Sequence, residues 1–273
     1  MRRKNQNLIL KKLKELKRGR SFSSSLNASS EGNEWPKQQS ASPRRVQPFI
    51  LTCGKRLATF RRFVSSYEEI AHCMEPPVLI VRDAPSKSKK AYHKLLLKLK
   101  PSFVIEQPRY HDNEYKNLQK FMVEDFPRWA LQFSKADIIF IEDDAIFSKR
   151  FPSLLMQASA AIRNEVDFLT FFSQKAYPVS SKHKPLDIAY PINGVHYYGN
   201  ICVLFARRVL EDLYVNYQEL YKYPEGWDIR WGCYMEAKGY RLYRSKEHTV
   251  DHLIGPSAIT GKMKRERNES FTP

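Results

Sequence analysis

The chain has 273 residues and carries a formal net charge of +17. Its hydrophobic content of 42%, with 13% aromatic residues, excludes an intrinsically disordered chain and indicates a globular protein with a substantial core. The excess of Lys and Arg favours anionic partners such as nucleotide phosphates, nucleic acid or an anionic membrane surface.

Cysteine spacing and the length of apolar runs exclude further classes. The four cysteines show no CxxC spacing, so we expect reduced, mostly buried thiols rather than a zinc site or a disulfide framework. No stretch approaches the roughly 18 apolar residues that a membrane span requires. The run Leu8–Leu10 is too short for the core of a signal peptide. We therefore expect no transmembrane segment and a cytoplasmic location.

The N-terminal region differs in composition from the rest of the chain. Lys and Arg outnumber Glu in residues 1–48, and the segment 20–42 is rich in Ser, Asn, Gln and Gly, which is typical of a flexible arm. Residues 1–20 could form a basic amphipathic helix on an anionic membrane or a polyanion, remain a solvated tail, or act as a transit peptide. We expect a basic arm at 1–48, one folded domain at 49–260 and a basic tail at 261–273.

Strands and helices are predicted to alternate in the first half of the domain. Phe49–Thr52 is a predicted buried strand, and apolar residues recur at helical spacing over Leu57–Val64. Val78–Asp83 and Phe103–Glu106 are further predicted strands, separated by a basic helix at Ser88–Lys100. This order predicts an α/β fold with a mostly parallel central sheet flanked by helices.

The most informative stretch is IIFIEDDAIF, at residues 138–147. Ile138–Ile141 is an apolar run without alternation, typical of a strand covered on both faces, and the carboxylates Glu142, Asp143 and Asp144 follow it. If the strand persists, the first and third acids share one side and the second faces the other. Open α/β sheets bind ligands at the carboxyl ends of their strands. Because crowded buried acids need a cation or strong donors, we expect a divalent metal carrying a polyphosphate; loop or helix-cap acids are the alternative.

The segment after this stretch is predicted to border the site. The polar residues Ser173–Leu186 are typical of a loop across the site mouth. Val195–Phe205 is strand-like, and Gly194 and Gly199 would permit close backbone approach to a ligand.

The motif IEDDAIF, with a later WDIRWG and VDHLIG near the C-terminus, resembles the nucleotide-sugar glycosyltransferases of the GT-A fold. The resemblance is strongest to the bacterial lipooligosaccharide-type enzymes, which carry a Glu-Asp-Asp version of the Asp-x-Asp motif. It covers roughly residues 47–257. It implies a single GT-A-like domain, Mn²⁺ or Mg²⁺ as cofactor and a nucleotide-sugar donor.

The resemblance also implies roles for the acidic motif and for one histidine. Asp144 would bind the metal directly. Glu142 and Asp143 would address the ribose, the donor sugar or metal-bound water, with Glu142 also a candidate metal ligand. His252, in VDHLIG, would complete the metal shell.

Further residues are candidates for donor binding and catalysis. Thr52 and Arg56 would lie near the donor base or diphosphate. Asp83 stands where a ribose or base contact could come, although an Asp before Ala-Pro also suits a turn. Asp228, in WDIRWG, would act as general base toward the acceptor hydroxyl if the enzyme inverts the anomeric centre, with Glu225 as the alternate. A helix N-cap is the other role open to Asp228.

These expectations combine into a metal-dependent glycosyltransferase. Its acceptor is expected to be a glycan or lipooligosaccharide. The strong positive charge keeps open a hydroxylated base in DNA, as in phage-type DNA modification. A non-catalytic nucleic-acid-binding protein is the alternative from another class, but it leaves the buried acidic motif unexplained, and no helix-turn-helix or zinc signature supports it.

Overall fold

The computed structural model describes residues 46–53, 56–82, 89–162, 164–172, 178–194, 197, 199 and 201–253. All of them belong to one unit of the chain, Ser42–Pro273. The predictions for residues 1–45, for the tail at 261–273 and for Asp83 lie outside the described residues.

An eight-stranded sheet and a small two-stranded sheet form the centre of the fold. The large sheet has the strand order β3-β2-β1-β4-β8-β6-β9-β7. Its strands are β1 (Gln47–Cys53), β2 (Val78–Arg82), β3 (Phe103–Glu106), β4 (Ile138–Glu142), β6 (Phe168–Thr170), β7 (Ala189–Pro191), β8 (Cys202–Phe205) and β9 (Leu242–Ser245). The small sheet pairs β5 (Ala145–Phe147) with β10 (Val250–His252) in antiparallel orientation.

Strand pairing confirms the predicted α/β fold with a mostly parallel central sheet. Strands β3, β2, β1 and β4 are parallel, as the alternation of strands and helices predicts. Strand β8 runs antiparallel to β4 and β6, and β7 runs antiparallel to β9. The site strand β4 therefore lies at the centre of the sheet, between a parallel and an antiparallel neighbour.

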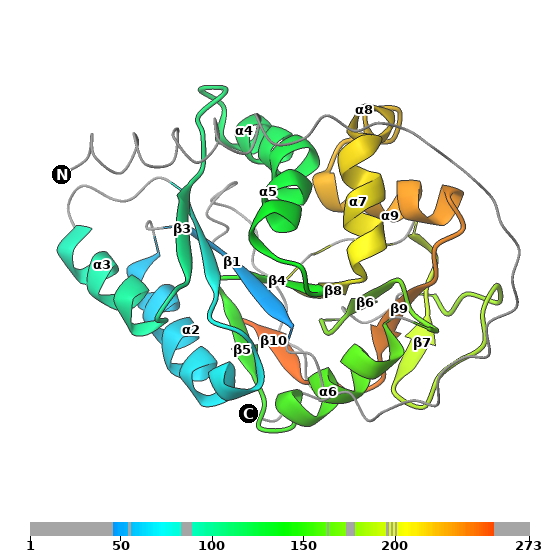
Figure 1. Cartoon of the computed structure of the whole chain (residues 1–273), viewed down its shortest axis with the longest axis horizontal. Helices are drawn as coiled ribbons and strands as arrows, with labels where there is room; N and C mark the ends of the chain where they lie inside the picture. The colour runs from blue at the N-terminus through cyan, green and yellow to red at the C-terminus, as the bar shows by residue number, and fades with distance from the viewer. Residues whose placement is uncertain are drawn as a thin grey trace, which may run out of the picture. The chain divides into compact units, whose positions relative to one another are not determined.

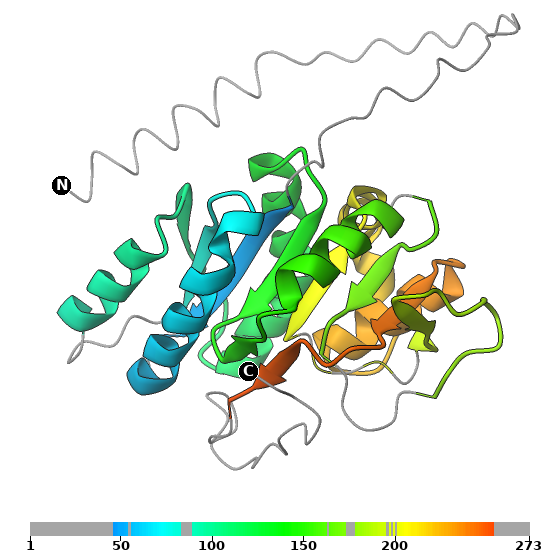
Figure 2. The same ribbon diagram turned by 90° about the horizontal axis from the view of Figure 1, so that it is seen from below.

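Helices cover both faces of the large sheet. Helices α2, α3 and α6 lie on one side, and α4, α5, α7 and α9 lie on the other (Figures 1 and 2). Their bounds are α2 (Leu57–Ile70), α3 (Lys89–Lys98), α4 (Glu114–Lys120), α5 (Phe126–Phe133), α6 (Phe151–Ala161), α7 (Arg207–Val215), α8 (Tyr217–Leu220) and α9 (Trp227–Ala237). A 3₁₀ turn, η1 (Ala71–Cys73), follows α2, and a π-helical segment, η2 (Phe121–Asp125), joins α4 to α5.

The helical pattern predicted around residues 115–129 is interrupted by that π-helical segment. Pro127 stands in the first turn of α5. Because proline has no N–H to donate to the preceding turn, the backbone loses one hydrogen bond there. The Phe126 N–H bonds to the Phe121 carbonyl, five residues back, which is the wider π spacing.

An aromatic cluster joins the central strand to helix α9. The Phe140 ring on β4 packs edge-on against Trp227 at 5.7 Å, and Phe126 lies 5.6 Å from Trp231. Phe205 on β8 meets Trp231 at 5.3 Å. These large side chains are buried, and edge-to-face pairs add to the stabilisation from burial. The start of α9 is thereby held against the strand that carries the acidic motif.

Candidate functional site

Two buried aspartates occupy the turn that follows β4. The strand ends at Glu142, and Asp143 and Asp144 lie in the turn before β5, only 2% and 1% exposed. The strand therefore does not persist through the three acids, and the alternation that would follow from a longer strand does not apply to Asp143 and Asp144. Because the turn breaks the alternation, both aspartates reach one guanidinium, that of Arg56.

Asp143 accepts hydrogen bonds from the end of β1. Its Oδ2 atom accepts from the Cys53 backbone N–H at 2.7 Å and from Thr52 Oγ1 at 2.9 Å, and its Oδ1 accepts from Arg56 Nη2 at 3.1 Å. The donors are close because β1 and β4 are parallel neighbours, so their carboxyl ends meet. Thr52 is fully buried, and its hydroxyl also lies 3.0 Å from the Tyr92 hydroxyl. Asp143 therefore ties the two strand ends together.

Asp144 meets the histidine that the sequence nominates as its partner. Its Oδ2 atom accepts from Arg56 Nη1 at 2.8 Å and lies 3.0 Å from His252 Nε2. His252 is opposite Ala145 in the β5–β10 pairing, and the Leu253 N–H donates to the Asp144 carbonyl at 2.8 Å. The pairing thus brings two residues 108 positions apart, Asp144 and His252 (252 − 144), into direct contact.

The charges at this site are unbalanced. Burial, and next the charge of Asp144, raises the pKa of Asp143, while Arg56 and the hydrogen bonds from Cys53 and Thr52 oppose the rise. Burial acts to lower the pKa of Arg56, but the two aspartates outweigh it and the pKa is raised. Among the described residues, the half-buried Glu142 adds a third carboxylate near the Arg56 guanidinium, a grouping that suits a further cation.

Asp144 and His252 have a spacing that suits two neighbouring ligands of an octahedral ion. Two ligands at right angles, each about 2.1 Å from Mg²⁺, lie about 3 Å apart, and Asp144 Oδ2 and His252 Nε2 are separated by 3.0 Å. Within the described part of the chain, no three His, Cys, Asp or Glu side chains are grouped to hold a metal, so Glu142 does not complete such a set. The remaining ligands would be diphosphate and water oxygens, as is usual for Mg²⁺.

Asp228 lies in the first turn of α9 but does not cap it. The helix begins at Trp227, and Gly226, with φ +112°, takes the cap position, so the N-cap alternative is wrong for Asp228. The Oδ1 atom accepts from the Ile229 N–H at 2.9 Å, and Oδ2 accepts from the Gly199 N–H at 2.8 Å.

Phe172 lies between the Asp228 side of the site and His252. If Gly199 carried a Cβ, that atom would lie 4.0 Å from Cε1 of the Phe172 ring. Its ring centroid is 6.2 Å from that of His252. Asp228, Gly199, Phe172 and His252 thus form a continuous series of neighbours that ends at Asp144. Sequence reasoning missed Phe172, and the only available signal was its place at the end of the apolar run DFLTFF, residues 167–172.

Glu225 stands apart from this series. It is exposed in the turn before α9. Burial raises the pKa of Tyr115, with further contributions from Asp228 and Glu225, so both acids lie near this tyrosine of α4.

Gly194 and the segment after it differ from their predicted roles. A Cβ on Gly194 would stand 1.9 Å from the Gly232 carbonyl oxygen, so this glycine permits close contact with α9 rather than with a ligand. The predicted strand Val195–Phe205 is shorter, because β8 begins at Cys202. Gly199, with φ +85°, has a backbone conformation that is incompatible with a regular strand.

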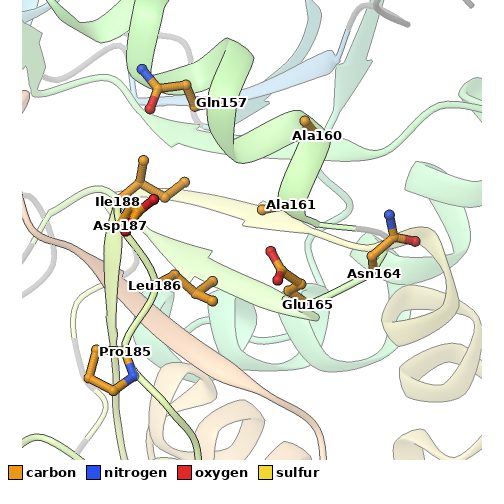
Figure 3. Close-up of a pocket in the computed structure, with 9 residues that line it drawn as sticks. All are labelled: Gln157, Ala160, Ala161, Asn164, Glu165, Pro185, Leu186, Asp187 and Ile188. Carbon is orange, nitrogen blue, oxygen red and sulfur yellow. The ribbon is translucent and has the colours of Figure 1, made fainter.

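A hollow lies away from the acidic motif, between the end of α6 and the segment before β7 (Figure 3). Its volume is about 610 Å³. The lining residues are Gln157, Ala160, Ala161, Asn164, Glu165, Pro185, Leu186, Asp187 and Ile188. The described lining residues include two carboxylates and neither Lys nor Arg, a composition that does not favour a nucleotide diphosphate.

Comparison with known proteins gives distant structural similarities. No protein-family model matches the sequence, and no curated protein does. The inositol-1-phosphate CTP transferase of T. maritima is similar with a TM-score of 0.42 and 13% identity, over 74% of this chain and 85% of that chain. TarS of S. aureus is similar with a TM-score of 0.46 and 12% identity, over 76% of this chain and 36% of that chain.

A third solved structure, the nucleoside-diphosphate-sugar pyrophosphorylase of Vibrio cholerae RC9, has a TM-score of 0.45 and 12% identity, over 76% of this chain and 95% of that chain. Similarity at this level does not assign an activity. Among the helices that the structure describes, none has both the length and the apolar character for a transmembrane span. The described cysteines are free thiols, three of them buried, as predicted.

Proposed function

We propose that this protein is a metal-dependent glycosyltransferase that moves a sugar from a nucleotide-diphosphate donor to an acceptor hydroxyl. The observation that carries the proposal is the contact of Asp144 with both His252 and Arg56 at the carboxyl end of the central strand β4. Crowded buried carboxylates at this end of an open α/β sheet suit a cation that carries phosphate oxygens.

Asp144 and His252 would hold Mn²⁺ or Mg²⁺, and Glu142, which is not grouped with them among the described residues, would act through metal-bound water. When bound there, such an ion supplies positive charge that stabilises the departing nucleotide diphosphate. Arg56 would bind the donor diphosphate, since a guanidinium is the side chain best suited to phosphate oxygens.

Other donor contacts stay predictions. Thr52 and Arg56 both donate to Asp143, which holds Arg56 beside the ends of β1 and β4. We propose that Glu142 and Asp143 border the donor ribose or sugar. Asp83, outside the described residues, is proposed at the ribose or base.

Asp228 is the proposed general base. The Gly199 N–H donates to one carboxylate oxygen, which fixes the orientation of the group. A carboxylate held in this way can accept the proton of an attacking acceptor hydroxyl that comes within hydrogen-bond reach. Glu225 is the alternate base, and a glycan or lipooligosaccharide is the proposed acceptor.

A donor screen tests this proposal. The full-length protein is incubated with a panel of nucleotide sugars and Mn²⁺, with glycan acceptors or hydroxymethylated duplex DNA, and free nucleoside diphosphate is measured. We expect release from one donor, increased by one acceptor class and abolished by chelator. Absence of release from every donor, or release that chelator does not affect, would contradict the proposal; acceleration by DNA alone would replace the glycan acceptor.

A further inference from the structure

The guanidinium of Arg56 spans two carboxylates at once. Its Nη2 atom lies 3.1 Å from Asp143 Oδ1 and its Nη1 atom 2.8 Å from Asp144 Oδ2. Both carboxylates are almost fully buried, and the arginine side chain is 17% exposed. Arg56 therefore supplies positive charge in the position where the sequence predicts a metal ion.

The two carboxylates are held differently. Asp143 also accepts hydrogen bonds from Thr52 and Cys53, so its position is fixed independently of Arg56. Asp144 uses the same oxygen, Oδ2, toward both Arg56 and His252. That oxygen is also the proposed metal ligand. Because a guanidinium and a divalent cation repel each other strongly at such short range, they compete for it.

We propose that Arg56 exchanges partners when the donor binds, an inference that rests on the proposed function. Without metal, Arg56 neutralises Asp144. When a nucleoside diphosphate arrives with a divalent cation, Arg56 leaves Asp144, keeps its bond to Asp143 as a pivot, and donates to a diphosphate oxygen. Charge-assisted bonds from guanidinium to phosphate are among the stronger hydrogen bonds in proteins, so the diphosphate compensates Arg56 for the lost carboxylate.

The exchange couples the two binding events. A metal ion alone must displace Arg56 from Asp144 without offering the guanidinium a new partner. A metal ion with diphosphate offers one. Arg56 therefore weakens the binding of metal alone and strengthens the binding of diphosphate in the presence of metal, and by linkage each ligand increases the affinity for the other.

Replacement of Arg56 by an uncharged residue separates this exchange from a merely structural role. Binding of Mn²⁺ alone is followed by electron paramagnetic resonance, and binding of nucleoside diphosphates at saturating Mn²⁺ by calorimetry. In Arg56→Gln we expect Mn²⁺ alone to bind about tenfold more tightly and the diphosphate about tenfold more weakly, within the usual range of coupling between sites. The matched control is Arg61→Gln, at an exposed arginine of α2, the helix that directly follows Arg56, and it should change neither affinity.

The opposite signs of the two changes are the test. If Arg56→Gln lowers the affinity for both ligands or changes neither affinity, while the native protein binds both, the proposed exchange of partners is wrong and the proposed function stands. If the native protein binds neither Mn²⁺ nor any nucleoside diphosphate, both fail. Should Arg56→Gln not fold, Arg56→Lys retains the charge, but its single ammonium does not match the two-pronged fork of the guanidinium. We expect shifts of the same signs and smaller size, and any other result overturns the exchange.

Discussion

Two clusters in which arginine pairs with buried aspartate have opposite charge balance. At the carboxyl end of β4, Asp143 and Asp144 share the single guanidinium of Arg56. Next to the start of β6, the single carboxylate of Asp167 pairs with both Arg208 and Arg241. Both groups of acids are buried, so burial alone does not distinguish a functional cluster from a structural one.

The pKa values show the consequence of that difference. Burial raises the pKa of Asp143, and the neighbouring Asp144 raises it further. Burial acts in the same direction on Asp167, but hydrogen bonds from the Arg241 backbone and side chain and from Arg208 outweigh it and lower its pKa. The Asp167 cluster is complete as it stands. Among the described residues, the β4 cluster has more carboxylates than guanidiniums, a balance that suits a bound cation.

The Asp167 cluster has a clear structural task. The Arg241 N–H donates to Asp167 Oδ2 at 2.8 Å, just before β9 begins, and the Ala206 N–H donates to the Asp167 carbonyl at 2.9 Å, just before α7. One residue thereby joins β6, β9 and α7. Mutations in the two clusters should consequently affect different quantities.

The largest effect is expected for Asp144→Asn. Loss of the carboxylate charge should lower the transfer rate by about 10³-fold, comparable to removal of a strong electrostatic stabiliser from an active site. The free energy of unfolding should stay the same or rise, because one of two crowded carboxylates loses its charge. Initial rates at saturating donor measure the transfer rate, and urea unfolding measures the free energy of unfolding. Native activity in this variant would place the metal elsewhere.

A smaller loss is expected for Asp228→Asn. The amide can still accept from the Gly199 N–H but cannot act as a base, so turnover should fall by about 10²-fold with little change in donor affinity. Single-turnover kinetics and diphosphate binding check the two parts. Unchanged turnover would move the role to Glu225 or indicate a retaining mechanism.

Asp167→Asn should give the opposite pattern. Loss of charge-assisted hydrogen bonds should lower the free energy of unfolding by about 2 kcal/mol. Transfer per folded molecule should remain within about twofold of native, since the residue lies in the structural cluster. Urea unfolding and the activity assay test this prediction. A large loss of activity without a loss of stability would contradict the assignment of a purely structural role to the Asp167 cluster.

The pH dependence of that stability difference is the smallest effect. Because the pKa of Asp167 is lowered in the folded state, its contribution is present above the unfolded value of about 3.9 and is lost as the pH falls through the folded value. The difference between native protein and Asp167→Asn should therefore be largest near pH 7 and shrink below about pH 4. Asp112→Asn, at an exposed site, is the control and should show little difference at either pH. A constant difference for Asp167→Asn would contradict the assigned pKa direction.

Local sequence patterns predicted the parallel half of the fold well. The apolar runs at β1, β2 and β4 are continuous because these strands are buried on both faces, so their bounds could be placed within about two residues. The edge strand β3 was also placed correctly, although only Ile105 of its four residues is buried. The regular apolar spacing of α2 likewise matches its buried face of Phe60, Phe63, Val64, Tyr67 and Ile70. The position of Asp144 after a predicted strand also placed it correctly near the carboxyl end of β4.

Contacts between distant segments could not be predicted from local patterns, and only the family resemblance placed His252 near Asp144. Arg56 and Asp143 are 87 residues apart, and only the pairing of β1 with β4 brings them together. The pairing of β10 with β5, which brings His252 to Asp144, leaves no local periodicity because each strand has three residues. The contact of Gly194 with Gly232 depends on how α9 packs, and a glycine alone does not reveal what approaches it.

The central claim is that Asp144 and His252 together form the metal end of a nucleotide-diphosphate site. The most direct test is a crystal structure of the full-length protein with Mn²⁺ and a nucleoside diphosphate, with anomalous difference maps at the manganese edge. We expect a peak within about 2.2 Å of both Asp144 Oδ2 and His252 Nε2, in contact with the diphosphate. A bound diphosphate with its manganese peak elsewhere, for example between Glu165 and Asp187, would contradict it.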